Sequence, residues 1–169
     1  LYHVMDVLTK RFPDVLFENC ASGGARMDAG MMYYFPQTWA SDNSDAVCRL
    51  KIQYGTSLCY PPVMTTSHIS ASPNHQMLRQ TPLDFRAAVS YPFNLGYELN
   101  LCKMSDEEIE KISEQTALYK KIRPLVQGGK FYRLLSPFEG NQTAWMTVSQ
   151  DETEFLVWYY KDFADPEEA

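Results

Sequence analysis

The sequence predicts an α/β fold followed by an all-β segment, and three observations support this. Short β-branched or aromatic runs alternate with helical patterns up to about residue 127, which is typical of parallel sheets with crossover helices. Two consecutive glycines then mark a change of pattern at residues 128–129. Beyond them, strand-like runs follow one another without a helix. We therefore expect two domains, over residues 1–127 and 128–169.

Four strand–helix units are expected in the first domain. A helix is predicted from Asp45 to about Leu58, and another is predicted to begin with Thr81 as N-cap and Pro82 at its first position. Each helix follows a strand candidate and connects it to the next one. The strand candidates are residues 14–20, 36–41, 62–70 and 94–102.

The longest predicted helix follows the fourth strand candidate. Ser105 and Glu108 have the spacing of a capping box. Glu107 and Lys111 are spaced for an i,i+4 ion pair. Pro124 is expected to end or bend this helix because its ring clashes with the preceding turn.

The second domain is predicted to be antiparallel. One strand is expected over residues 130–137. A hairpin is expected to join residues 143–149 to residues 154–160 through a turn at residues 150–153.

Composition fits a folded protein and argues against several functional classes. The 169 residues are 45% hydrophobic and 14% aromatic, which is enough to form a core. The net charge is −6, and the 15 Lys and Arg residues are scattered. Nucleic acid is therefore not expected as a partner, because phosphate binding requires clustered positive charge. A membrane is not expected either, since no apolar run approaches the roughly 18 residues that a spanning helix needs.

The chain begins without Met, inside an amphipathic helical pattern, so we expect a fragment without a signal peptide. Its four cysteines are widely spaced and lack the paired spacing of a metal site. Reduced thiols in a cytoplasmic protein are favoured over disulfides. The cysteines are Cys20, Cys48, Cys59 and Cys102.

Two architectures remain open for residues 1–127. Four units in this length give roughly 32 residues per unit, which is close to the pace of a (β/α)8 barrel of ~250 residues. An open doubly wound sheet fits the alternation equally well. Both architectures bind ligands at the carboxyl ends of their strands.

Polar residues crowd the end of the second strand candidate. For Asp45 a helix-capping role is favoured, since a carboxylate suits the first turn of a helix. For Asp42 a cap and a ligand-binding role are equally open. His68, at the end of the third strand candidate, is expected to have a structural role.

A glycine-containing loop, Cys20–Gly23, follows the first strand candidate. Its glycines would let the backbone approach a ligand closely. A phosphate-binding loop is disfavoured, since the spacing matches neither GxGxxG nor GxxxxGK(S/T). Cys20 has no evident His partner as a nucleophile, so a small buried residue is favoured there.

Several long stretches resemble one known family. They are ENCASGGARMDAGMMYYFPQTWASDNSDA, RLKIQYGTSLCYPP, NLGYELNL and YKKIRPLVQGGKFYRLLSP. Together they are similar to the C-terminal part of bacterial α-galactosidases of glycoside hydrolase family 36. The resemblance implies strands five to eight of a (β/α)8 barrel, followed by the start of an antiparallel β-sandwich. It also implies retaining hydrolysis of terminal α-D-galactosyl residues of melibiose and raffinose-type oligosaccharides, by a homotetramer when the enzyme is intact.

The resemblance also implies residue roles. Asp42, the first Asp of the SDN motif, corresponds to the general acid/base, and the loop containing Cys20, Ser22 and Gly23 corresponds to a wall of the galactose pocket. Ala25 stands where the family often has a third glycine. The family's nucleophile lies in an upstream KWD-like motif that is absent here, so this chain alone is expected to be inactive. No metal or organic cofactor is expected, because two carboxyl groups suffice for this reaction.

Two other hypotheses remain open. A truncated, non-catalytic chain could act as a sugar-binding or interaction module. An α/β enzyme with a different substrate could carry a similar strand-end carboxylate.

Overall fold

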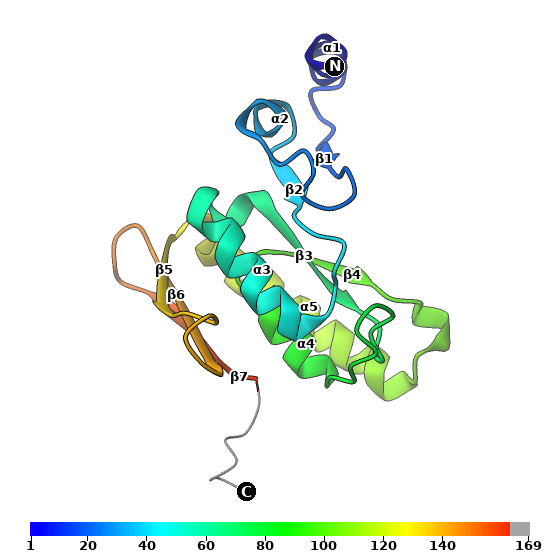
Figure 1. Ribbon diagram of the computed structural model, residues 1–169, viewed down its shortest axis with the longest axis vertical. Coiled ribbons are helices and arrows are strands. Elements are labelled where there is room, and N and C mark those ends of the chain that lie inside the picture. Colours follow the sequence, from blue (N-terminus) through cyan, green and yellow to red (C-terminus); the bar gives the residue numbers. More distant parts are fainter. Residues whose placement is uncertain (163–169) are drawn as a thin grey trace, which may run out of the picture.

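The computed structural model describes residues 1–162 and contains two separate sheets. The first is parallel, with four strands in the order β1-β2-β3-β4, and the second is antiparallel, in the order β5-β6-β7. Helices α3, α4 and α5 lie between the two sheets, whereas α1 and α2 lie at the far end beside β1 and β2 (Figure 1). The predicted α/β pattern followed by antiparallel strands is confirmed for these residues.

The elements have the following bounds. The helices are α1 (Tyr2–Arg11), α2 (Ala29–Tyr34), α3 (Ala46–Cys59), α4 (Leu83–Ser90) and α5 (Asp106–Gly128), with 3-10 turns at Pro62–Met64 and Leu101–Lys103. The strands are β1 (Glu18–Asn19), β2 (Gln37–Trp39), β3 (Thr65–Ser70), β4 (Asn94–Glu98), β5 (Lys130–Leu135), β6 (Gln142–Val148) and β7 (Phe155–Lys161). None of the helices within residues 1–162 is long and apolar enough to cross a membrane.

The parallel strands are shorter than the sequence predicted. β1 has two residues, because only Glu18 and Asn19 pair with β2. β2 has three residues, which pair with β1 on one side and with β3 on the other. A strand ends where its ladder partner ends, and the apolar residues before β1 have no neighbouring strand among the described residues. The third and fourth candidates likewise include a 3-10 turn before β3 and another after β4.

The capping signals predicted two helix starts correctly. The Asp45 carboxylate accepts a hydrogen bond from the Cys48 amide at 2.9 Å and caps α3. Ser105 and Glu108 form both bonds of a capping box at the start of α5. Each of these caps depends on residues within one helical turn, which explains why the local sequence was sufficient.

Three other local predictions were wrong in whole or in part. α4 begins at Leu83 with Pro82 as its N-cap, and the predicted cap Thr81 instead donates its amide to the Ser72 hydroxyl. α5 continues through Pro124 to Gly128, so Pro124 does not end this helix. Lys111 pairs with Asp84 of α4 at 3.1 Å, in place of Glu107 on its own helix. For Lys111, a contact between two different helices decided the outcome.

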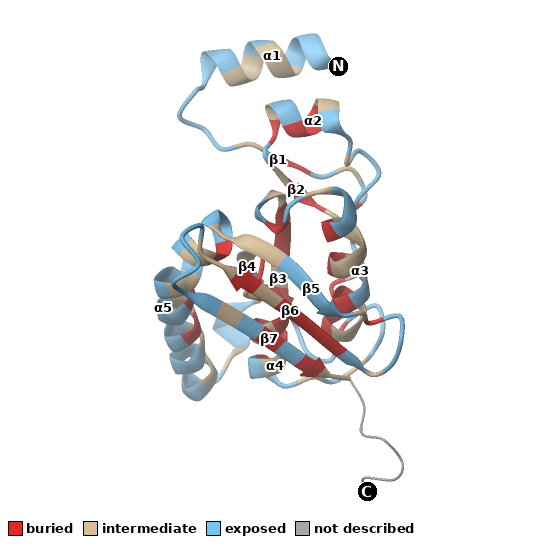
Figure 2. Ribbon diagram, turned by 90° about the vertical axis from the view of Figure 1, so that its left-hand side faces the viewer, coloured by how far each residue is buried: buried red, intermediate tan, exposed pale blue. Residues whose placement is uncertain are grey.

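The hairpin of β6 and β7 is confirmed, with Trp145 opposite Trp158. β6 is the central strand and is mostly buried (Figure 2). A single hydrophobic cluster joins this sheet to the three helices beneath it, so residues on both sides of position 128 share one core. Its buried members are Ala46, Leu50, Val89, Phe93, Val126, Trp145, Trp158 and Tyr160. A smaller cluster of Ile69, Leu83 and Ala87 packs β3 against α4.

Candidate functional site

The carboxyl ends of β1 and β2 bring together the two segments that the sequence singled out. Gly23 has φ +69°, and a Cβ atom at this position would lie 2.8 Å from the Asp42 amide nitrogen and 2.8 Å from Ser41 Cα. A Cβ atom on Gly24 would lie 2.6 Å from the Ala40 carbonyl oxygen. Side chains do not tolerate such distances to backbone atoms, so only glycine lets this loop lie directly on the end of β2.

The predicted site residues of this loop differ in exposure. Cys20 and Ser22 are exposed, whereas Gly23 is buried against β2. The expectation that Cys20 is a small buried residue is therefore wrong. Ser22 has φ 51°, so the turn places two consecutive residues in the left-handed region. The loop can therefore present the Cys20 and Ser22 side chains at the strand ends while its glycines contact the neighbouring backbone.

Asp42 does not cap a helix. Its side chain is exposed and forms no hydrogen bond or ion pair within residues 1–162. Its backbone carbonyl accepts a hydrogen bond from the side chain of Gln76 at 2.8 Å. The capping interpretation of Asp42, left open by the sequence, is therefore not supported, and its carboxyl group is available to a ligand at the strand end.

Asp45 has the opposite environment although it lies only three residues further along. Its side chain is 1% exposed, caps α3 and forms an ion pair with Arg79. Burial, with the Asp45 carboxylate next in importance, raises the pKa of the nearby Cys48 thiol. The predicted capping role of Asp45 is confirmed.

The other polar residues of this segment bond to its backbone. The Asn43 side-chain oxygen accepts from the Asp45 amide at 3.0 Å, and the Ser41 hydroxyl accepts from the Asn43 amide at 3.3 Å. These short-range bonds give hydrogen-bond partners to backbone amides that lie between β2 and α3 and belong to neither element. The SDNSD segment thus combines one exposed carboxyl group with several residues that shape the turn beneath it.

Arg49 of α3 connects the segment after β2 to β3 through hydrogen bonds. It is 1% exposed. It donates to the Ser41 carbonyl at 3.0 Å and to the Thr66 carbonyl of β3 at 3.1 Å. Its guanidinium carbon lies 4.2 Å from the centre of the Trp39 ring, a cation–π distance. Burial lowers the pKa of Arg49 to about 10, so it remains positively charged at neutral pH. It ties the segment after β2 to the beginning of β3.

His68 of β3 packs beside this group. Its ring stacks on Trp39 with centroids 4.3 Å apart, and its Nδ1 lies 3.7 Å from the Glu98 carboxylate. A Cβ atom on Gly96 would lie 2.6 Å from the His68 ring. Burial lowers the pKa of His68. This packing is consistent with the structural role expected for His68.

Comparisons with known proteins identify the family of this chain. A family model described as Melibiase matches residues 1–129. The chain belongs to the melibiase family. The α-galactosidase AgaA of Geobacillus stearothermophilus is 56% identical to it over 165 residues, which are 98% of this chain and 23% of AgaA. Alpha-galactosidase 1 of Pediococcus pentosaceus is 51% identical over 98% of this chain and 23% of its own length.

Solved structures extend this similarity to the fold. The crystal structure of AgaA, a GH36 α-galactosidase, matches 98% of this melibiase-family chain with a TM-score of 0.95 and 55% identity, over 23% of the AgaA chain. AgaA variants have been solved in complex with raffinose and with stachyose. This chain therefore spans about a quarter of the length of the relatives that it matches.

The candidate site includes residues that the sequence prediction missed. Arg49, Asn74 and Gln76 bind the backbone or side chains of the segment after β2. The helical spacing of Ala46, Arg49 and Leu50 could have indicated that Arg49 lies on the buried face of α3. No local pattern marked Asn74 or Gln76, because their partners lie about 30 residues away.

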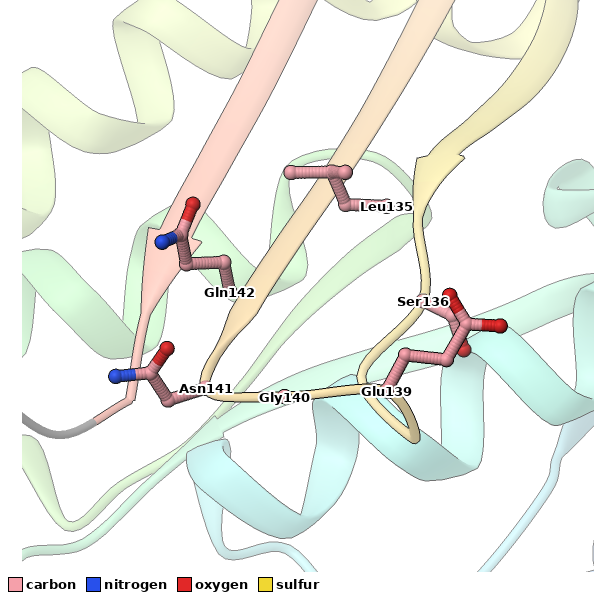
Figure 3. Close-up of a pocket in the computed structure, with 6 residues that line it drawn as sticks. All are labelled: Leu135, Ser136, Glu139, Gly140, Asn141 and Gln142. Atoms are coloured by element: carbon pink, nitrogen blue, oxygen red, sulfur yellow. The ribbon is translucent and has the colours of Figure 1, made fainter.

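Two other features fall outside this site. A cavity of about 330 Å³ lies at the turn between β5 and β6 (Figure 3). Its lining belongs to the antiparallel part of the chain: Leu135, Ser136, Glu139, Gly140, Asn141 and Gln142. Within residues 1–162, no group of three or more His, Cys, Asp or Glu side chains is arranged to hold a metal ion, and the four cysteines are free.

Proposed function

We propose that this chain is part of a retaining α-galactosidase that hydrolyses terminal α-D-galactosyl residues of melibiose and raffinose-type oligosaccharides. The observation that carries the proposal is the contact between the Gly23 loop and the Asp42 backbone, which brings an exposed carboxyl group beside a glycine turn at the strand ends. The α-galactosidase names of its relatives, and the raffinose and stachyose held by AgaA variants, support the same substrate class.

In this proposal Asp42 is the general acid/base. It donates a proton to the departing glycosidic oxygen and later accepts one from the attacking water. The nucleophilic carboxylate comes from a part of the enzyme outside this chain and attacks the anomeric carbon from about 5–5.5 Å across the site. Two carboxyl groups suffice for both steps, and the isolated chain is inactive because it holds only one of them.

The glycine loop forms one wall of the galactose pocket. Cys20 and Ser22 are exposed in this loop and contact the sugar, while Gly23 keeps the loop against the end of β2. A sugar hydroxyl group needs a polar partner when its water is removed. The Ser22 hydroxyl supplies such a partner at this position.

The proposed fold extends the two sheets beyond this chain. The sequential parallel order of β1 to β4 supports their assignment as strands five to eight of a (β/α)8 barrel over residues 1–127. The outer face of the antiparallel sheet exposes a group of apolar side chains that a second sheet of a β-sandwich would cover, which supports residues 128–169 as the start of such a domain. These side chains are Tyr132, Leu134, Phe155, Val157 and Tyr159. The homotetramer and the cytoplasmic location stay predictions.

The test uses the complete enzyme with Asp42→Ala. Loss of the acid should reduce turnover of substrates with poor leaving groups far more than turnover of aryl galactosides with good leaving groups. Azide should restore part of the rate for the activated substrates, because it attacks the glycosyl-enzyme without needing a general base. Asp106→Ala, at an exposed position at the start of α5, serves as the matched control. Equal, modest losses for all substrates would contradict the proposal.

A further inference from the structure

The loop between β3 and α4 holds the backbone around Asp42 through one side chain. The carboxamide of Gln76 accepts a hydrogen bond from the Ser44 amide at 3.1 Å and donates one to the Asp42 carbonyl at 2.8 Å. A single amide group thus bonds to the chain on both sides of Asn43. In a β-sheet, a neighbouring strand offers one donor and one acceptor to a chain segment in the same way. Here the side chain of Gln76 offers both.

The loop is built to hold Gln76 in this position. Asn74 is 3% exposed. Its side-chain oxygen accepts from the amides of Gln76 at 3.0 Å and Met77 at 2.9 Å. The Asn74 amide group donates to the Ser44 hydroxyl at 3.2 Å, and the Ser70 hydroxyl donates to the Ser44 carbonyl at 2.9 Å. Buried groups with this many partners have little freedom to move.

Arg49 restrains the same segment from the other side. Its guanidinium bonds to the carbonyls of Ser41 at 3.0 Å and Asn43 at 3.5 Å. The peptide groups before and after Asp42 are therefore held from α3 and from the β3–α4 loop, whereas the Asp42 side chain forms no bond within residues 1–162. Because no bond restrains the Asp42 carboxyl group, the position of its backbone determines which atoms this group can reach.

We propose that Gln76 is a positioning residue for the general acid/base Asp42. It holds the Asp42 backbone where the carboxyl group can reach the glycosidic oxygen. This inference rests on the proposed function of Asp42. Gln76 is exposed, so water can replace its partners when they are lost and the cost to folding is small. The cost to catalysis is larger, because general acid catalysis depends on the placement of the acid to a fraction of an ångström.

The experiment compares Gln76→Met with Gln80→Met in the complete enzyme. Met has nearly the shape of Gln but cannot form either bond. Gln80 is an exposed glutamine of the same loop and has no hydrogen bond to residues 41–45 within the described part of the chain. We expect Gln76→Met to lower kcat/KM roughly tenfold for substrates with poor leaving groups and much less for activated aryl galactosides. Gln80→Met should behave like the unchanged enzyme with both, and all three proteins should have similar thermal unfolding midpoints.

A second variant separates the two bonds. Gln76→Glu keeps the acceptor for the Ser44 amide but removes the donor to the Asp42 carbonyl. It should show the same dependence on the leaving group as Gln76→Met. Wild-type behaviour of Gln76→Glu would overturn the inference, since it would show that the bond to Asp42 is dispensable.

The failure of this inference is distinguishable from the failure of the proposed function. If Asp42→Ala lacks the signature of a lost acid, the proposed function is wrong. If Asp42→Ala has that signature but Gln76→Met equals Gln80→Met with every substrate, only the role of Gln76 is wrong. A lower unfolding midpoint of Gln76→Met, with equal losses for good and poor leaving groups, would also overturn it in favour of a structural role.

Discussion

The two sheets of this chain are stabilised by different kinds of side chain. Around the parallel strands, buried polar groups bond to one another and to the backbone, with Arg49 and Gln53 of α3 at their centre. Beneath the antiparallel sheet, aromatic rings pack together, with Trp145 in contact with Phe93 and Tyr160. Hydrogen bonds fix the direction of the groups that they join, whereas apolar packing mainly excludes water. The part that carries the candidate site therefore gains geometric precision, and the other part mainly contributes stability.

The two sheets also differ in the amount of strand pairing, which is smaller in the parallel sheet. β1 and β2 have two and three residues, whereas β6 and β7 have seven residues each and pair along their whole length. Short strands with few ladder bonds are easily opened. Side chains of α3 and of the β3–α4 loop compensate for these missing ladder bonds by forming hydrogen bonds to residues 41–45. A substitution in the antiparallel part should thus affect unfolding, and one in the parallel part should affect activity.

The largest expected effect is on stability, from Trp145→Ala. Trp145 is 0% exposed and lies at the centre of the cluster that joins the antiparallel sheet to the helices. Its removal leaves a large cavity and should cost about 3–5 kcal/mol of the free energy of unfolding. Urea denaturation of the complete protein measures this. Leu58→Ala, at a position 61% exposed on α3, is the control and should change stability by less than about 0.5 kcal/mol. Equal effects of the two changes would remove the contrast between the sheets.

An intermediate effect, larger on activity than on stability, is expected from Gly23→Ala. The new methyl group would meet Ser41 and Asp42 backbone atoms at 2.8 Å and would need φ +69°, so the loop must move away from the end of β2. In the complete enzyme, we expect about 1–3 kcal/mol of destabilisation and at least a roughly tenfold loss of the proposed galactosidase activity. Gly140→Ala is the control. It is the same substitution, but a Cβ atom at that position would have no heavy atom within 4 Å. Unchanged kinetics of Gly23→Ala would show that this contact does not shape the site.

The smallest expected effect is a pH dependence of the parallel part, through His68. Burial lowers its folded pKa below the ordinary value of 6.5, so the unfolded chain takes up the proton first. Stability from neutral His68 is therefore complete above pH 6.5 and is lost as the pH falls from there toward the folded pKa. His68→Phe keeps a ring against Trp39 but cannot titrate. Its thermal unfolding midpoint should fall less than that of the unchanged protein between about pH 7 and about pH 5.

The matched control for this comparison is His3→Phe, at an exposed position in α1. It should keep the pH dependence of the unchanged protein. Identical pH dependence of His68→Phe and the unchanged protein would mean that another group accounts for the slope.

Local signals predicted much of the fold correctly. Asp45 and the Ser105–Glu108 pair marked helix starts because each bonds to an amide within the next turn. The hairpin of β6 and β7 followed from two alternating runs around a polar turn. Predictions that depended on a competing partner elsewhere were wrong, as Lys111 shows by pairing with Asp84 in place of Glu107.

The sequence by itself determined the order of the strands, the caps of α3 and α5, and the choice of Asp42 over its neighbours as the candidate acid. These depend on contacts within a few residues and on long motifs. Only the tertiary structure decided that Gly23 lies on the Asp42 backbone and that Arg49 and Gln76 hold the segment from opposite sides. The physical reason is that hydrogen-bond donors and acceptors find partners by distance in space, so a glutamine 34 residues from its acceptor carries no local pattern that reveals the bond.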